Sequence, residues 1–344
     1  MRRCGGGGGT NLRRYLLKKA VTVVLTVLLI SSVNFFIFQV LPGDPTYAII
    51  PRGGNGIGGN CTGNQVGNAQ CGLRAELIAA WGLDKPLPQR YLIYMSNLLQ
   101  GNFGTSITVR PGVPVTQVIG PVLSTTLILI GLATFLTMWL GIVLGRISGW
   151  RRGSGTDVSI TLFTLIGYSM PSFWVSLILI FGLAYVAHLF PLRLQISPDP
   201  LVNGLDTLYY WSLPVLAFML TNVAWFSLTL RNSLTDVLPE DYMVTAAAKG
   251  LTERQQLHWH ALPNARLPLV TASALYFGWI VSGVIVIETV FNINGVGLLT
   301  WNATKLNDYP LLGAIFLVAT IGVVIGNAVA DLLYTLLDPR VREG

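Results

Sequence analysis

The residue types that most often perform chemistry are few in this chain and form no recognisable site. The 344 residues include three His and three Cys. His188 stands alone, and His258 and His260 have no carboxylates at the spacing of a metal site at membrane depth. No Gly-x-x-x-x-Gly-Lys-Ser/Thr sequence occurs, so the chain lacks a phosphate-binding loop of that kind. The sequence therefore predicts no catalytic centre, no bound metal and no bound cofactor.

Polar residues gather instead in segment 240–268, between two uncharged stretches. Pro239 suits a first helical position, and Asp241 suits the positive end of a helix dipole. A run of small residues then favours helix: Ala246, Ala247 and Ala248. Gly250 followed by apolar Leu251 predicts a Schellman-type end to this helix.

A second helix is predicted directly afterwards. Thr252, with Gln255 three residues on, forms a capping box, and Pro263 is expected to end this helix after Leu262. Two short helices joined at a glycine, and tethered at both ends to apolar stretches, predict a compact knob that docks into another protein.

The composition places the whole chain in a membrane. Hydrophobic residues make up 52% and charged residues 11%, whereas soluble domains carry about 25% charged residues. Several uncharged stretches are too long for the buried helices of a soluble protein and long enough to cross roughly 30 Å of hydrocarbon. The predicted spans are 20–41, 122–145, 158–187, 207–230, 267–287 and 309–330. We expect an all-α polytopic membrane protein.

The distribution of Lys and Arg predicts the orientation. Fifteen of the 22 Lys and Arg lie in the tail 1–19, the loop after the second span, the loop 231–266 and the C-terminal tail 338–344. These segments and both termini are therefore expected in the cytoplasm.

A nucleic-acid partner is not expected, because no clustered basic face with stacking aromatics is visible. A cleaved signal peptide is disfavoured, because the first apolar run is long and no small-residue cleavage site follows it.

The region 42–121 is the only sizeable segment expected outside the membrane, and it is predicted to form a cap with short helices at 74–81 and 88–99. Cys61 and Cys71 lie in a Gly/Asn-rich part of it. On an oxidising face they can form a disulfide; two thiols or a metal pair are the alternatives. The remaining residues, 122–337, form the predicted membrane core.

Inside the spans, charges are almost absent, which argues against proton or sodium coupling. Pro171 lies within the third predicted span, where helix packing is favoured over a functional hinge. Some aromatic and polar side chains could line a passage, although core packing explains each equally well: Tyr168, Ser169, Asn222, Tyr276 and Ser282.

The polar segment resembles the signature of ABC-importer permeases, written Glu-Ala-Ala, three residues, Gly, nine residues, Ile-x-Leu-Pro. Gly250 takes the glycine, and Leu262-Pro263 falls at the required distance. The departures are Val244 for Glu, Thr245 for the first Ala and His260 for Ile. Further fragments resemble the peptide/nickel branch, in order along the chain: LPGDP (41–45), GLDKPLPQRY (82–91), GNFGTS (101–106), SMPSFW (169–174), ETVF (288–291) and LDPRVR (337–342). The long loop after the first span and the last fragment resemble the first, B-type permease of such importers.

The resemblance implies the six-helix fold of type I importer permeases and a location in the bacterial cell membrane. It implies a heterodimer with a second permease, two ATP-binding cassette subunits that bind ATP and Mg, and an extracytoplasmic peptide-binding protein. Within loop 231–266, here called the coupling loop, the residues expected to contact an ATPase subunit are Thr245, Ala246, Ala247, Ala248, Gly250, Leu251, Leu257, Trp259, Leu262 and Pro263. Of these, Leu251, Leu257 and Trp259 are the expected apolar anchors.

Three alternatives remain open at this point. An importer of the same architecture could carry nickel or another small solute. A self-sufficient secondary transporter would predict midplane charges or inverted repeats, neither of which is visible. An intramembrane enzyme would need catalytic residues that the chain does not show.

Overall fold

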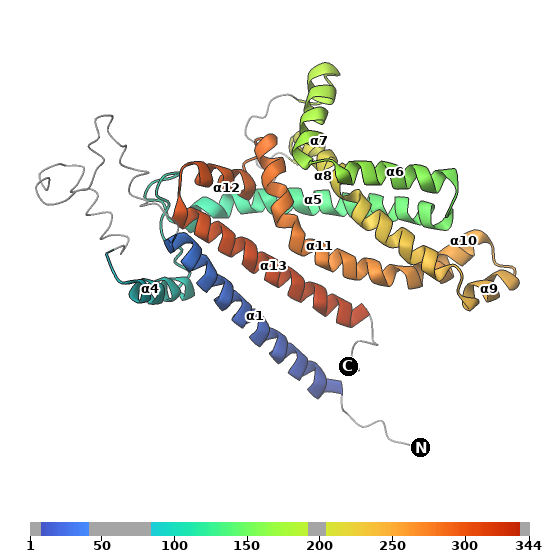
Figure 1. Ribbon diagram of the computed structural model, residues 1–344, viewed down its shortest axis with the longest axis horizontal. Coiled ribbons are helices and arrows are strands. Elements are labelled where there is room, and N and C mark those ends of the chain that lie inside the picture. Colours follow the sequence, from blue (N-terminus) through green and yellow to red (C-terminus); the bar gives the residue numbers. More distant parts are fainter. Residues whose placement is uncertain (1–7, 41–83, 192–203, 338–344) are drawn as a thin grey trace, which may run out of the picture. The chain divides into compact units, whose positions relative to one another are not determined.

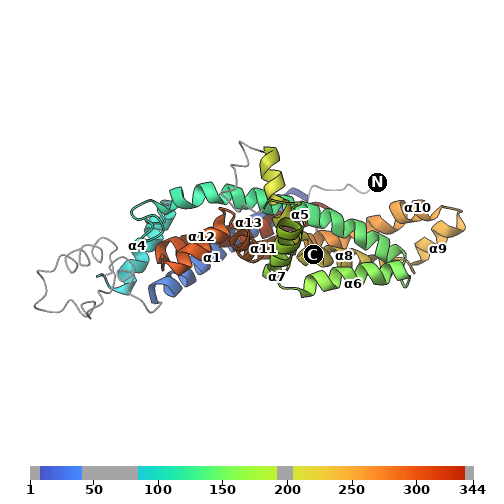
Figure 2. The same cartoon turned by 90° about the horizontal axis from the view of Figure 1, so that it is seen from above.

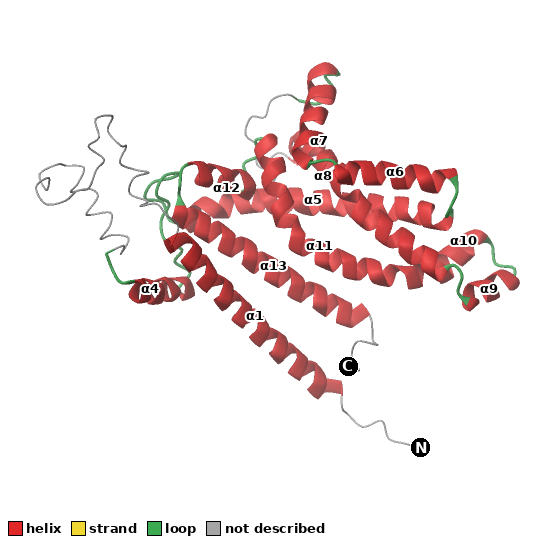
Figure 3. Cartoon of the chain, in the orientation of Figure 1, coloured by secondary structure: helices red, strands yellow, loops and turns green. Residues whose placement is uncertain are grey.

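A computed structural model describes residues 8–40, 84–191 and 204–337 (Figure 1). Figure 3 shows only helices and loops in these ranges, and an isolated bridge between Thr105 and Pro114 is their one β-type pairing. The helices belong to two compact units. Unit 1 comprises Met1–Val122 and Leu299–Val324, and unit 2 comprises Leu123–Leu298 and Ile325–Gly344. Cys61 and Cys71, and the predicted helix 74–81, lie outside the described residues.

In unit 1, α1 (Gly8–Val40) packs against α4 (Leu87–Leu99) and against the beginning of α13 (Tyr309–Leu337). The Asn34 amide on α1 donates to the backbone carbonyl of Gly313 at 2.8 Å. A polar group inside an apolar helix is costly unless it is bonded, so this contact joins the two helices at a defined height. The α4 helix agrees closely with the helix predicted at 88–99.

In unit 2, α8 (Gly204–Val237) is the central helix, and it contacts α6 (Gly155–Ser169), α7 (Ser172–Leu179) and α11 (Leu262–Val290). Its large side chains Trp211 and Phe226 are almost fully buried. They belong to one core, to which α5 (Val115–Trp150) and the π-helical η1 (Ile180–Val186) also contribute. Figures 1 and 2 show that α9 (Asp241–Ala248) and α10 (Glu253–Gln255) lie where α8 ends and α11 begins.

Among the described residues, four helices are long and apolar enough to cross a membrane, or five if one bent pair counts as a single span. The bent pair is α6 with α7 and η1, which meet at 103°. The predicted span 158–187 is therefore bent in this structure, and not one continuous helix. Pro171 explains the break, because proline forces the preceding residue out of the helical region, and Met170 is extended with φ −86° and ψ 135°.

The apolar stretch 267–287 lies within α11, which continues beyond it at both ends. After α11, the short helix α12 (Val296–Lys305) precedes α13, and the sequence did not predict it. Both differences arise where hydropathy is a poor guide, because the ends of these helices carry polar residues.

Candidate functional site

The first helix of the coupling loop ends as the sequence predicts. Gly250 has φ +78°, a left-handed conformation that favours glycine. Its N–H donates to the Ala247 carbonyl at 2.9 Å, and the Leu251 N–H donates to the Ala246 carbonyl at 3.4 Å. This pair of bonds is the Schellman pattern. The helix α9 begins at Asp241 with Glu240 as its N-cap, so Pro239 precedes the helix instead of occupying its first position.

The second helix begins with the predicted capping box. The Thr252 N–H donates to Gln255 Oε1 at 2.9 Å, and the Gln255 N–H donates to Thr252 Oγ1 at 3.4 Å. Two exposed helix-end donors are thereby satisfied reciprocally. The turn from Gly250 to Glu253 is thus fixed by local bonds on both sides.

Pro263 does not end this second helix, contrary to the prediction. After α10 the chain forms a π-helical turn, η2 (Gln256–Ala261), and continues directly into α11, with Pro263 in its first turn. The wider turn relieves the clash expected between a proline ring and the carbonyl four residues earlier. The Asn264 amide then donates to the His260 carbonyl at 2.8 Å. The coupling loop is therefore continuous with a long helix of the core.

One face of the coupling loop packs inward on the end of α8. Met243 and Ala261 are buried with Leu230 and Leu234 of α8, and Leu257 and Leu262 pack against the same cluster. Ala246 is also buried, at 3% exposure. Leu257 is half-buried in this structure, and the expected contact of Ala246 and Leu257 with an ATPase subunit stays a prediction.

Other residues of the coupling loop are exposed, and two of them are large and apolar. Trp259 is 64% exposed and Val244 63%. Thr245, Ala247 and Ala248 are exposed beside them, and Leu251 is half-buried. Partial burial and the nearby Glu240 carboxylate raise the pKa of the Tyr242 phenol in this loop, so the phenol stays neutral at pH 7. Of the three expected anchors, Trp259 is the most exposed.

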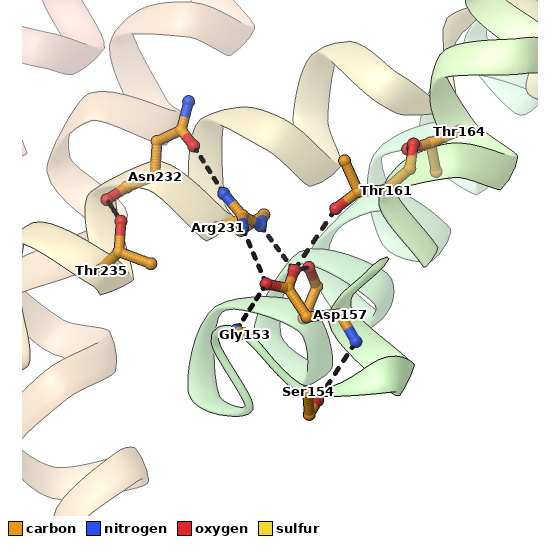
Figure 4. A network of polar contacts seen from close by, with 9 residues as sticks. Gly153, Ser154, Asp157, Thr161, Thr164, Arg231, Asn232 and Thr235 are labelled. Atoms are coloured by element: carbon orange, nitrogen blue, oxygen red, sulfur yellow. Dashed lines mark hydrogen bonds and ion pairs between the residues drawn. The ribbon is translucent and has the colours of Figure 1, made fainter. Parts of the chain in front are cut away.

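The frame beneath the coupling loop is held by a buried ion pair. Arg231 of α8 donates to Asp157 at the start of α6, with Nε to Oδ1 at 2.6 Å and a terminal nitrogen to Oδ2 at 2.7 Å (Figure 4). The same carboxylate accepts bonds from the Gly153 N–H, the Ser148 hydroxyl and the Thr161 hydroxyl. Asp157 is thus buried with its oxygens fully bonded, as a buried charge requires.

Three glycines one turn apart bring α5 directly against α8 near this ion pair. A Cβ atom at Gly145 would lie 2.5 Å from the Ser227 carbonyl oxygen, and one at Gly149 would lie 2.9 Å from Leu234 Cβ. Gly141 is equally close, with 2.5 Å to Phe226 Cβ. At the end of α5, Trp150 packs on the cluster under the coupling loop. The ends of α5, α6 and α8 and the coupling loop therefore form one closely packed body.

The residues considered for a passage differ in their exposure. Tyr168 and Ser169 are exposed at the end of α6, beside the break in the span. Tyr276 is buried and packs edge-on against Phe226, with ring centroids 4.9 Å apart. Asn222 is half-buried and its amide donates to the Phe218 carbonyl. The Ser282 side chain lies outside the described residues, and the passage stays a prediction.

Comparison with known proteins decides the family. The profile described as "Binding-protein-dependent transport system inner membrane component" matches residues 141–343. A companion profile for the N-terminal part of such membrane components matches residues 12–112. The chain belongs to this permease family.

Curated relatives cover nearly the whole permease. A probable peptide ABC transporter permease protein, y4tP of Sinorhizobium fredii, is 35% identical over 92% of this chain and 96% of its own length. The oligopeptide transport system permease protein AppB of Bacillus subtilis is 33% identical, over 92% of this chain and 95% of AppB. The dipeptide transport system permease protein DppB of Escherichia coli is 32% identical with the same coverage.

A solved structure of the MetNI methionine ABC transporter matches with a TM-score of 0.50 at 14% identity. The match covers 63% of this chain and 96% of that one. At this identity the likeness shows the fold alone, that of an ABC-importer permease. This chain is accordingly a membrane subunit and not itself an ATPase.

Two buried carboxylates of the permease, whose structural role the sequence did not predict, each fix the start of a helix. Glu288 is 0% exposed; its Oε2 accepts the Gly297 N–H at 2.6 Å, and its Oε1 accepts the Thr126 hydroxyl at 2.7 Å. The Val296 N–H donates to the same Thr126 hydroxyl oxygen. A carboxylate at the positive end of a helix dipole is favourable, so Glu288 holds the start of α12 to α5 and α11.

Asp308 performs a comparable task at the start of α13. Its Oδ2 accepts the Ser106 hydroxyl at 2.6 Å. It also accepts three consecutive backbone N–H groups at 3.0 Å each, those of Ile107, Thr108 and Val109. An Asp before the first residue of a helix is a known N-cap signal, and Pro310 strengthens it. The partner segment, however, lies 202 residues earlier, which no local pattern reveals.

Proposed function

We propose that this chain is a transmembrane permease subunit of an ATP-driven importer that moves di- or oligopeptides into the cell. Its family membership and the peptide transport named for its relatives support the solute class. The bias of Lys and Arg supports cytoplasmic termini in a bacterial cell membrane. The chain would pair with a second, homologous permease and receive peptide from an extracytoplasmic binding protein.

The observation that carries the mechanism is the exposed apolar face of the coupling loop on a closely packed frame. In this proposal Trp259 and Val244 enter a cleft on an ATP-binding cassette subunit, and two such subunits bind and hydrolyse ATP with Mg. A side chain as large as Trp259, 64% exposed, is the type of residue that dominates binding energy at interfaces.

Movement of the docked loop would pass to the membrane core because the loop does not move alone. Its inward face packs on α8, and α8 is joined to α6 through Asp157 and Arg231. ATP binding would draw the two ATPase subunits together and shift the permeases between inward-open and outward-open states. The two states form a bistable element that ligand binding at a distant site biases.

Reconstitution tests the proposal. The chain is purified from its native membrane in mild detergent, its companions are identified, and the complex is placed in liposomes loaded with ATP and Mg. We expect a second permease and P-loop ATPases to copurify, and labelled dipeptide added with the binding protein to accumulate only when ATP is inside. Uptake without ATP, driven by an ion gradient, would instead establish a secondary transporter. ATP-dependent uptake of nickel and not of peptide would overturn the solute class alone.

A further inference from the structure

The sides of the short helix α4 differ in their residues. Tyr91 and Tyr94 point to α1 and are half-buried. One flank carries apolar residues at helical spacing i, i+4, i+7 and i+11: Pro88, Leu92, Met95 and Leu99. The next flank carries Gln89, Ser96 and Gln100, interrupted by Ile93. Residues spaced in this way lie along one side of a helix, so the apolar and polar stripes run side by side.

Within the described part of the chain, three residues of the apolar flank are exposed and Met95 is half-buried. Leu92 is 67% exposed and Leu99 is 82% exposed. Leucine side chains so exposed on a short, ordered helix indicate a surface that meets something other than water. The neighbourhood of α4 identifies what that is.

The helix α4 touches α1 over a single turn. The Tyr91 hydroxyl lies 2.8 Å from Ser32 Oγ, and the rings of both tyrosines lie against Phe35, with centroids 5.3 and 5.4 Å away. Two helices that ran alongside each other would make contacts over several turns. The α4 helix therefore crosses α1 near the C-terminal end of α1, next to which Figure 1 draws it.

The height of this crossing follows from the span itself. The apolar stretch that begins within α1 runs to Leu41 in the sequence. With a rise of about 1.5 Å per residue, Ser32 lies about 14 Å and Phe36 about 8 Å before that end. The tyrosine side chains thus contact α1 within the apolar part of its span, near the end of the span, where a ring that is apolar and carries a polar hydroxyl is suited to lie.

We propose that α4 lies in the membrane interface at the C-terminal end of α1, with its Pro88–Leu92–Met95–Leu99 flank in the phospholipid acyl chains. The tyrosines hold α4 to α1, and the Gln89–Ser96–Gln100 flank faces water. Such a division into apolar and polar sides is what an interfacial amphipathic helix requires. Lipid is the favoured occupant because the exposed leucines lie beside a face that already contacts the apolar part of a membrane span.

This inference goes beyond the transport function and does not depend on the solute. Depth measurements with spin labels test it in the full chain embedded in phosphatidylethanolamine/phosphatidylglycerol nanodiscs. The native cysteines are first replaced by Ser. Single labels are then introduced by Leu92→Cys and Leu99→Cys on the apolar flank. Gln89→Cys and Ser96→Cys on the polar flank of the same helix serve as matched controls. All four side chains are exposed, so a label displaces no packing.

Oxygen concentrates in acyl chains, whereas a water-soluble nickel chelate stays outside them. We expect the ratio of oxygen to nickel collision rates at 92 and 99 to exceed that at 89 and 96 at least tenfold. Equal ratios at the four positions would show that the apolar flank faces water and would refute the proposal. Exclusion of both reagents from 92 and 99 would show that protein covers them, and would refute it equally. Neither outcome bears on peptide uptake, so this proposal and the transport function fail independently.

Discussion

Substitutions at Gly250 disturb the backbone conformation of the coupling loop without removing any side-chain contact. The residue has φ +78°, and a Cβ atom there would meet nothing within 4 Å. Any cost of a substitution therefore comes from the backbone alone. A left-handed conformation costs an L-residue roughly 1–2 kcal/mol, least for Asn and most for β-branched residues.

A cost of this size lowers the fraction of molecules in which the turn at Gly250 has its native conformation. About 1–2 kcal/mol changes a two-state ratio by a factor of roughly 5–30. We therefore expect ATPase subunits to bind the permease several-fold more weakly in Gly250→Ala and more weakly still in Gly250→Val, with Gly250→Asn nearest to wild type. Thermal unfolding of the membrane core should stay nearly unchanged, because the turn lies outside the buried clusters.

The assay is titration of purified ATPase subunits onto the permease in nanodiscs, followed by ATP hydrolysis with peptide-loaded binding protein. Gly112 is a matched control, since it has the same φ of +78° and equally open surroundings but lies in unit 1. Gly112→Val should leave ATPase affinity unchanged. Wild-type affinity in Gly250→Val would refute docking through this loop. An equal loss in all three Gly250 variants, Asn included, would refute the argument from backbone strain.

Three further substitutions test the frame and the helix caps. Arg231→Met should destabilise the permease by about 3 kcal/mol, because it leaves the carboxylate of Asp157 buried without its ion-pair partner. Asp157→Asn should cost less, because Arg231 is 24% exposed and reaches water; a reversed order in detergent melting curves would contradict this reasoning. Glu288→Gln can keep its amide oxygen on the Gly297 and Leu298 N–H groups, but its NH2 then replaces the oxygen that accepts the Thr126 hydroxyl, which should cost about 1–3 kcal/mol. Hydrogen exchange at the start of α12 should become faster, and unchanged exchange would argue against the cap. Gly145→Val should reduce the yield of monodisperse protein in size-exclusion chromatography, because its Cβ would lie 2.5 Å from an α8 carbonyl, whereas Gly131→Val on the same helix meets open space and should not.

The parts of the fold that the sequence predicted are those encoded by neighbouring residues. The turn at Gly250 and the capping box of Thr252 with Gln255 both depend on contacts within a few residues, and the structure confirms both. The helix at 88–99 likewise follows from local periodicity.

The predictions that differ from the structure concern residues whose local sequence is compatible with two structures, and only tertiary contacts decide between the two. Pro171 and Pro263 both lie in segments whose pattern predicts a helix. Pro171 breaks its span, whereas Pro263 lies in the first turn of α11, after a π turn. Ala246 and Leu257 belong to the signature, and the structure places Ala246 in a buried position and packs Leu257 on the cluster that includes α8. The sequence did not reveal this burial, and docking of these two residues stays a prediction.

The buried polar contacts were beyond prediction for a different reason. Glu288 bonds to Thr126, and Asp308 to Ser106, across separations of 162 and 202 residues. With only one sequence, a carboxylate at the edge of a span gives no indication of which distant segment it holds. The proposed interfacial position of α4 was unpredictable for the same reason. Neighbouring residues encode the apolar flank of α4, but the depth of α4 in the membrane depends on its contact with α1.

The central claim is that the exposed face of the coupling loop is seated on an ATP-binding subunit. A photo-crosslinking amino acid in place of Trp259, activated in native membranes, tests it most directly. Met243, on the inward face at 4% exposure, provides the matched control. We expect position 259 to crosslink to a P-loop ATPase and position 243 to crosslink only within the chain. Crosslinks from position 259 to lipid or to the permease alone, with no ATPase, would contradict it.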